Sequence, residues 1–192
     1  MKIKYFSYQL LFAICTLFFF INCINDSAGN AEAVSGEINF SITSNVIDAD
    51  GFIPIQFTCD GPDFSPPLFW SDAPQDTKSF AIICDDNYAP GKTWVHWVIF
   101  NIPTTASRLP DGVTITNSIY EEIVQGKNDF GDLGYGGPCP PKGHGVHKYY
   151  FKIYALDQMI ELKEGVTKKE LVKAMKGHIL DEAEFIGKYE RQ

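Results

Sequence analysis

Three polar residues near strand ends could bind an anion or transfer protons. His96 lies in the strand-like segment WVHWVIF, His147 begins HKYYFKIYA, and Asp86 ends SFAIICDD. Alternate residues of a strand face the same side, so each of the three shares a face with apolar neighbours. Imidazoles gain or lose a proton near neutral pH, and carboxylates commonly orient them. Taken singly, they are typical of core histidines and a turn-capping aspartate; together they indicate a polar cluster in a small pocket.

The segments that must position these residues are short, β-branched or aromatic, and separated by turns rich in Gly, Pro and Asp. They are residues 37–44, 52–58, 67–70, 79–84, 94–100, 119–124 and 147–156. This pattern predicts a mainly β, mostly antiparallel domain. The segment 94–100 is apolar on both faces, so we expect it to be central and His96 to be enclosed.

One helix is predicted near the C-terminus. Thr167 and Glu170 have the spacing of a capping box. Apolar residues then recur at helical spacing, at Leu171, Val172, Met175 and Ile179. We expect this helix to pack on the sheet.

The amino-acid composition and net charge limit the classes of function that this protein could have. The 192 residues are 45% hydrophobic and carry a formal net charge of -8, which fits one globular domain that buries a full core. The acidic balance argues against a nucleic-acid-binding protein, because such proteins need a positive field to neutralise phosphates.

The N-terminus has the pattern of an export signal. Lys2 and Lys4 precede an apolar run from Leu10 to Ile21, which is short for a membrane span. Cys23 follows where a bacterial lipoprotein would carry its lipid. Lipidation at Cys23, cleavage after a small residue such as Gly29, and an uncleaved anchor all stay open. Residues 1–24 are thus a leader, 25–36 a polar tether and 37–192 the domain, and we expect a periplasmic or membrane-tethered protein of a bacterial envelope.

The cysteines agree with an oxidising compartment. Cys84 lies in an apolar strand and is expected to be a small buried residue. Cys59 and Cys139 each lie at the edge of a turn, and we predict that they form a disulfide, although spacing alone cannot establish a pairing.

Several separated motifs, in order, resemble the phosphatidylethanolamine-binding protein family in its bacterial branch of Raf kinase inhibitor-like proteins. They are FTCDGPDFSPPLFW, CDDNYAPGKTWVHWVIFNIP, NDFGDLGYGGPCPPKGHGVHKYYFKIYALD and MKGHILDEAEFIGKYER. The resemblance as a whole runs from about Glu37 to Arg191. The resemblance implies an antiparallel β-sandwich with a few peripheral helices and a shallow pocket for an anionic head group.

The resemblance also assigns site residues. The family motif DPDAP is DNYAP here, which puts Tyr88 where the family has its second aspartate and leaves the ligand preference open. GxHRY is GVHKY, with Lys148 for the usual arginine. The ligand-binding residues implied are Asp86, Pro90, Trp94, His96, Pro140, Pro141, Lys142 and His147. Rim residues are Tyr88, Tyr149 and His144, an extra imidazole that we expect to be exposed.

The loop before His147 fits such a pocket. Its glycines let the backbone approach a ligand, and its prolines keep it stiff, which lowers the entropic cost of binding. Asp86 would favour a protonated imidazole, so an acidic protein could still bind phosphate.

Three functions are consistent with these observations. The first is a binding protein for phosphate, phosphorylethanolamine or a phospholipid head group, without turnover, cofactor or metal. The second is an inhibitor of a protease or kinase through the pocket region. The third is a metal-dependent or acid–base enzyme using His96, His147 and Asp86, although the sequence contains no HExxH, GxSxG or P-loop motif.

Overall fold

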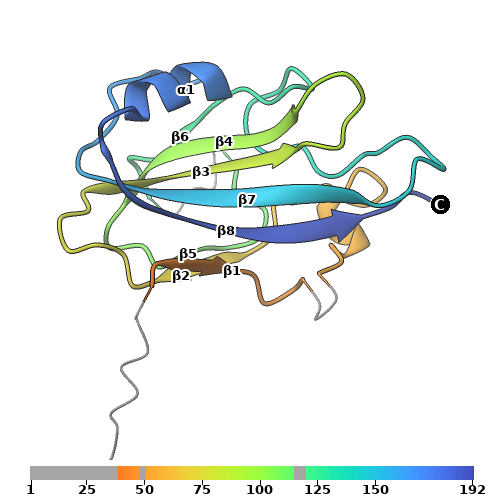
Figure 1. Ribbon diagram of the computed structural model, residues 1–192, viewed down its shortest axis with the longest axis horizontal. Coiled ribbons are helices and arrows are strands. Elements are labelled where there is room, and N and C mark those ends of the chain that lie inside the picture. Colours follow the sequence, from red (N-terminus) through yellow and green to blue (C-terminus); the bar gives the residue numbers. More distant parts are fainter. Residues whose placement is uncertain (1–38, 48–50, 115–119) are drawn as a thin grey trace, which may run out of the picture. The chain divides into compact units, whose positions relative to one another are not determined.

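Two antiparallel sheets form the fold, and strands of the larger one carry Asp86, Trp94, His96 and His147 of the predicted site. The computed structural model describes residues 39–47, 51–114 and 120–192, which belong to one unit, Glu37–Gln192. The smaller sheet has the order β1 (Ser41–Thr43), β2 (Leu68–Ser71), β5 (Arg108–Leu109). The larger has the order β6 (Val124–Gln125), β4 (Trp94–Pro103), β3 (Ser79–Asp86), β7 (His147–Leu156), β8 (Ile179–Tyr189). Figure 1 shows the larger sheet between the smaller one and the helix α1. The predicted mainly β fold is confirmed.

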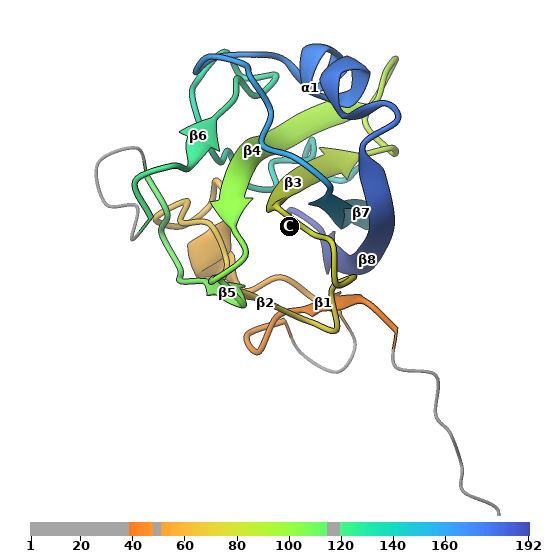
Figure 2. The same cartoon turned by 90° about the vertical axis from the view of Figure 1, so that its left-hand side faces the viewer.

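Strand β3 is central because both of its faces are buried. All eight of its residues are buried, and it pairs with β4 on one side and β7 on the other. Ile82 and Cys84 face the core shared with the smaller sheet, whereas Ala81 and Ile83 face a second cluster beneath α1. Because successive side chains of β3 point to opposite faces of the sheet, this one strand contributes to two hydrophobic clusters. Figure 2 shows these layers from the end.

The helix α1 (Lys168–Met175) begins where the capping box predicts. Thr167 Oγ1 accepts the backbone N–H of Glu170, and Glu170 accepts that of Thr167. Leu171 and Met175 are fully buried against the larger sheet. The helix ends earlier than predicted, because Gly177 takes a positive φ of 87° and Ile179 starts β8 rather than a further helical turn.

Two strand predictions were wrong. The segment 52–58 forms a 3₁₀ turn, η1 (Ile55–Phe57), because Pro54 precedes it and Thr58 donates its N–H and its hydroxyl back to the Ile55 carbonyl. In 119–124, residue 119 lies outside the described residues, and only Val124 belongs to a strand.

Strand β8 was not predicted at all. It is an edge strand on which charges interrupt the apolar alternation, notably Asp181, Glu182 and Glu184, and charges on an edge protect it from pairing with other chains. In the described part of the chain no helix is long and apolar enough to cross a membrane.

Candidate functional site

Asp86 and His147 form a buried pair at the adjoining ends of β3 and β7. Oδ2 of Asp86 lies 2.6 Å from Nδ1 of His147, and the two residues are 3% and 2% exposed. The other carboxylate oxygen accepts the backbone N–H of Tyr88 at 2.7 Å. Because the carboxylate accepts from Nδ1, the imidazole orientation is fixed and Nε2 points away from Asp86.

His144 continues this chain of hydrogen bonds to the surface. Its Nδ1 lies 2.8 Å from Nε2 of His147. Gly143 and Gly145 flank it with φ angles of 73° and 82°, a conformation that glycine adopts without a steric cost. The loop therefore turns back so that His144 is exposed, as expected, and yet contacts the buried pair.

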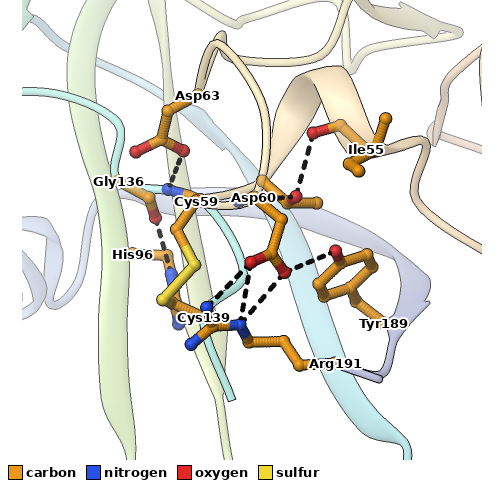
Figure 3. Close-up of a disulfide and its surroundings, with 11 residues drawn as sticks. Ile55, Cys59, Asp60, Asp63, His96, Gly136, Cys139, Tyr189 and Arg191 are labelled. Atoms are coloured by element: carbon orange, nitrogen blue, oxygen red, sulfur yellow. Dashed lines mark hydrogen bonds and ion pairs between the residues drawn. A yellow bond between two sulfur atoms is a disulfide. The ribbon is translucent and has the colours of Figure 1, made fainter. Parts of the chain in front are cut away.

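His96 reaches the same region from β4. Its Nδ1 lies 2.6 Å from the carbonyl oxygen of Gly136 (Figure 3). A carbonyl only accepts, so Nδ1 carries a proton and Nε2 of the neutral ring is an acceptor. Burial lowers the pKa of His96, while the hydrogen bond with Gly136 and the charge of Asp86 oppose that effect. The neutral ring is therefore the favoured form at neutral pH.

These residues surround a cavity of about 170 Å³, called here the histidine cavity. Its lining residues are Asp86, Ala89, Pro90, Trp94, His96, Phe130, Cys139, Pro140, Pro141, His147 and Tyr149. Nε1 of Trp94 and the hydroxyl of Tyr149 are buried and have no hydrogen-bond partner among the described residues. Because buried polar groups are nearly always paired, these two are candidates to pair with a ligand.

A disulfide fixes the loop that forms one wall. Cys59 and Cys139 are bonded, with their Cα atoms 5.4 Å apart, which gives the pairing that their turn positions suggested (Figure 3). Gly137 donates its N–H to Asp63 Oδ1 at 2.8 Å. A Cβ on Gly137 would lie 2.2 Å from that oxygen, so only glycine allows this approach.

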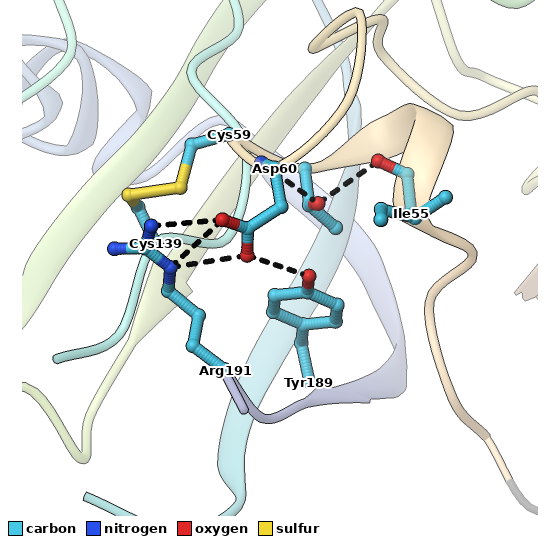
Figure 4. Close-up of polar contacts among 7 residues, drawn as sticks. Ile55, Cys59, Asp60, Cys139, Tyr189 and Arg191 are labelled. Atoms are coloured by element: carbon cyan, nitrogen blue, oxygen red, sulfur yellow. Dashed lines mark hydrogen bonds and ion pairs between the residues drawn. A yellow bond between two sulfur atoms is a disulfide. The ribbon is translucent and has the colours of Figure 1, made fainter. Parts of the chain in front are cut away.

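A second set of contacts joins Asp60, the neighbour of Cys59, to the end of β8 and the residues that follow it. The guanidinium of Arg191 contacts both carboxylate oxygens of Asp60 at 2.8 to 3.0 Å, and the Tyr189 hydroxyl donates to Asp60 at 2.8 Å (Figure 4). These hydrogen bonds lower the pKa of Asp60. Cys59 is thus held by its disulfide and by the anchoring of its neighbour.

Comparison with known proteins places this chain in a family. Residues 43–190 match the family described as phosphatidylethanolamine-binding protein. The chain belongs to that family. The resemblance inferred from the separated motifs is confirmed.

Relatives in the family come from distant organisms. A UPF0098 protein of Methanothermobacter thermautotrophicus is 47% identical over 79% of this chain and 99% of its own length. A solved PEBP homologue from Chlamydia trachomatis has 39% identity and a TM-score of 0.72, covering 80% of this chain and 98% of that one. E. coli YbcL, described as a new member of the mammalian PEBP family, has 35% identity and a TM-score of 0.75, covering 80% and 99%.

Most residues that the family resemblance assigned lie together in the structure. The ones that line the histidine cavity are Asp86, Pro90, Trp94, His96, Pro140, Pro141, His147 and the rim residue Tyr149. Lys142 is exposed and is not one of the lining residues. Tyr88 is 48% exposed, and Nζ of Lys148 lies over its aromatic ring, 5.5 Å from the centre of the Tyr88 ring. Cys23 lies outside the described residues.

Sequence reasoning missed Phe130 and the carbonyl of Gly136. Phe130 packs edge-on against Trp94 and His96, with ring centres 5.3 and 5.4 Å apart. Its signal in the sequence was an aromatic residue inside a loop of Gly, Asp and Asn within the family motifs. The role of Gly136 has no side-chain signal. Among the described residues, no group of three His, Cys, Asp or Glu side chains could hold a metal ion.

Proposed function

We propose that this domain binds a phosphate group in the histidine cavity, as free phosphate, phosphorylethanolamine or a phospholipid head group, without turnover. The observation that carries the proposal is a pair of buried hydrogen-bond donors without acceptors on residues that line a small cavity. Nε1 of Trp94 and the hydroxyl of Tyr149 have no partner among the described residues, and His147 lies beside them. An anion would satisfy these donors.

Asp86 does not oppose an anion as a free carboxylate would. Oδ1 accepts the backbone N–H of Tyr88 and Oδ2 contacts Nδ1 of His147. Both carboxylate oxygens are therefore already paired within the protein, and Nε2 of His147 lies on the side of the ring away from them. In this proposal Nε2, when it carries a proton, donates to a phosphate oxygen. Nε2 of His96 is an acceptor in the neutral ring, which suits a ligand that carries a P–OH or an ammonium group.

The contact between Nε2 of His147 and His144 favours binding without turnover over a catalytic role. In an acyl-transfer site, the Nε2 of such an imidazole faces a hydroxyl or thiol nucleophile. Here it contacts Nδ1 of His144. The thiol of Cys84 is fully buried and its pKa is raised by that burial, so it has little thiolate to act as a nucleophile.

Calorimetric titration with phosphate and with phosphorylethanolamine tests this proposal. We expect saturable heat that is lost in His147→Ala. The matched control is His178→Ala, which removes another aspartate-paired histidine, 2.9 Å from Asp157 on the surface. Binding that disappears in both variants, or that persists in His147→Ala, would refute the proposed site.

We also propose that the protein acts outside the cytoplasm. The disulfide supports this, because such bonds persist mainly in oxidising compartments, as does the export pattern of residues 1–24. Cell fractionation tests it: recovery of the protein in the cytoplasmic fraction, with Cys59 and Cys139 reduced, would contradict it.

A further inference from the structure

A second and larger cavity lies on the other side of the strand that carries His96. It measures about 640 Å³ and is called here the outer cavity. It is lined by the start of β4, the loop after β6 and the first turns of α1, at Thr93, Val95, Lys127, Asn128, Asp129, Gly131, Thr167, Lys168, Lys169 and Val172. Thr93 and Val95 line the outer cavity. Trp94 and His96, which alternate with them along the chain, line the histidine cavity. Strand alternation thus separates the two sites.

The outer cavity has an excess of positive charge. Of the four lysines in or beside it, Lys168 pairs with the buried Asp85, and Lys92 pairs with Asp129 at 3.1 Å. Lys127 and Lys169 have no ion-pair partner among the described residues. Two ammonium groups are therefore available to an anion in a protein whose net charge is -8.

Other polar groups of the lining are already used. Asp129 also accepts the backbone N–H of Val95 at 2.9 Å. The side-chain amide of Asn128 donates to Gly134 and accepts two backbone N–H groups. Thr167 is used in the capping box of α1. A ligand would meet few free acceptors or uncharged donors here.

The remaining surface is apolar. Val172 is 42% exposed on the helix whose neighbours Leu171 and Met175 are fully buried. Val95 lies across the cavity on β4, and the hydrocarbon stems of lysines add to such surfaces while their ammonium groups stay in water. Cavities of this size commonly hold small ligands.

We propose that the outer cavity binds a medium-chain fatty carboxylate. Lys127 and Lys169 hold the carboxylate, and the acyl chain lies against Val95 and Val172. The cavity combines two unpaired cations with an apolar wall, and this ligand class matches both. The proposal does not depend on phosphate binding in the histidine cavity.

Titration of the intact protein with octanoate, decanoate and dodecanoate, below their micelle concentrations, tests the apolar part. Affinity should rise about three- to fourfold for each added methylene. Amide NMR signals of Val95, Lys127 and Val172 should move on binding, while that of His147 should not. Movement confined to the histidine cavity, or no saturable binding, would overturn the proposal.

Variants test the charged part. Lys127→Gln and Lys169→Gln should each weaken dodecanoate binding roughly two- to fivefold. Lys173→Gln is the matched control, because Lys173 is exposed on the same helix and does not line the cavity, and it should bind as the unaltered protein does. Val172→Asp, at an exposed position, should abolish the chain-length dependence. Equal binding by all four variants would overturn the proposal.

Discussion

Oδ2 of Asp86 lies 2.6 Å from Nδ1 of His147 in a region from which water is almost excluded. Removing one partner of such a pair leaves the other buried without compensation. We predict that Asp86→Asn lowers the free energy of unfolding by roughly 3 kcal/mol and weakens phosphate binding by roughly tenfold.

The matched control for that variant is Asp157→Asn. Asp157 pairs with His178, but both side chains are substantially exposed, and exposed pairs stabilise little. Denaturant unfolding and calorimetry of the two variants should therefore differ. Equal effects would mean that burial of the Asp86 pair has no special role.

Nδ1 of His144 occupies Nε2 of His147, since the two nitrogens are 2.8 Å apart, so it would compete there with the proposed phosphate ligand. We predict that His144→Ala raises the affinity for phosphate at neutral pH by about two- to tenfold, the equivalent of one hydrogen bond. Calorimetry measures this directly. A weaker affinity in the variant would instead make His144 a contact of the ligand.

The lowered pKa of His96 makes stability depend on pH. The ordinary pKa of histidine is about 6.5. As the pH falls below it, the His96 ring takes up a proton in the unfolded state more readily than in the native state. Its contribution to stability is therefore complete above that pH and is lost below it, by about 1.4 kcal/mol for each unit by which the pKa is lowered.

Denaturant unfolding between pH 7.5 and pH 5, a range chosen to span about 6.5, checks this sign. The variant His96→Gln should lose less stability than the unaltered protein over the range, because it lacks the imidazole whose charged form is disfavoured by burial. An identical slope for the two proteins would show that His96 is not held neutral by burial.

The disulfide should stabilise both the fold and the cavity wall. It joins residues 80 positions apart, and closing a loop of that length is worth about 4.5 kcal/mol in the chain-entropy account. The double variant Cys59→Ser, Cys139→Ser should therefore unfold at lower denaturant and bind phosphate more weakly. Arg191→Gln, which removes only the exposed ion pair with Asp60, should have a much smaller effect; the reverse order would contradict this account.

Local sequence patterns predicted the elements that hold the site, and long-range geometry determined the rest. The alternation in β3 and β7 indicated that Asp86 and His147 face inward. The 3₁₀ turn at Ile55 was missed because an apolar run with a proline resembles a strand, and its turn depends on hydrogen bonds from Thr58. Strand β8 was missed because an edge position allows charges that obscure the alternation.

Contacts made by the backbone or across loops had no sequence signal. The Gly136 carbonyl that fixes the His96 tautomer belongs to a residue without a side chain. His144 contacts His147 in a loop whose Gly143 and Gly145 both take positive φ angles. The outer cavity arises where α1, β4 and the loop after β6 meet, and no single segment encodes that arrangement.

The central claim is that an anion enters the histidine cavity and pairs with its free donors, and the indole N–H signals test it most directly. The chain has three tryptophans. Nε1 of Trp97 already donates to Gln125, and Trp70 lies in the core with β1 and β2. In a phosphate titration followed by proton–nitrogen NMR, we predict a saturable shift of the Trp94 signal, with those of Trp70 and Trp97 unchanged. A Trp94 signal that stays in place at saturating phosphate would contradict the account.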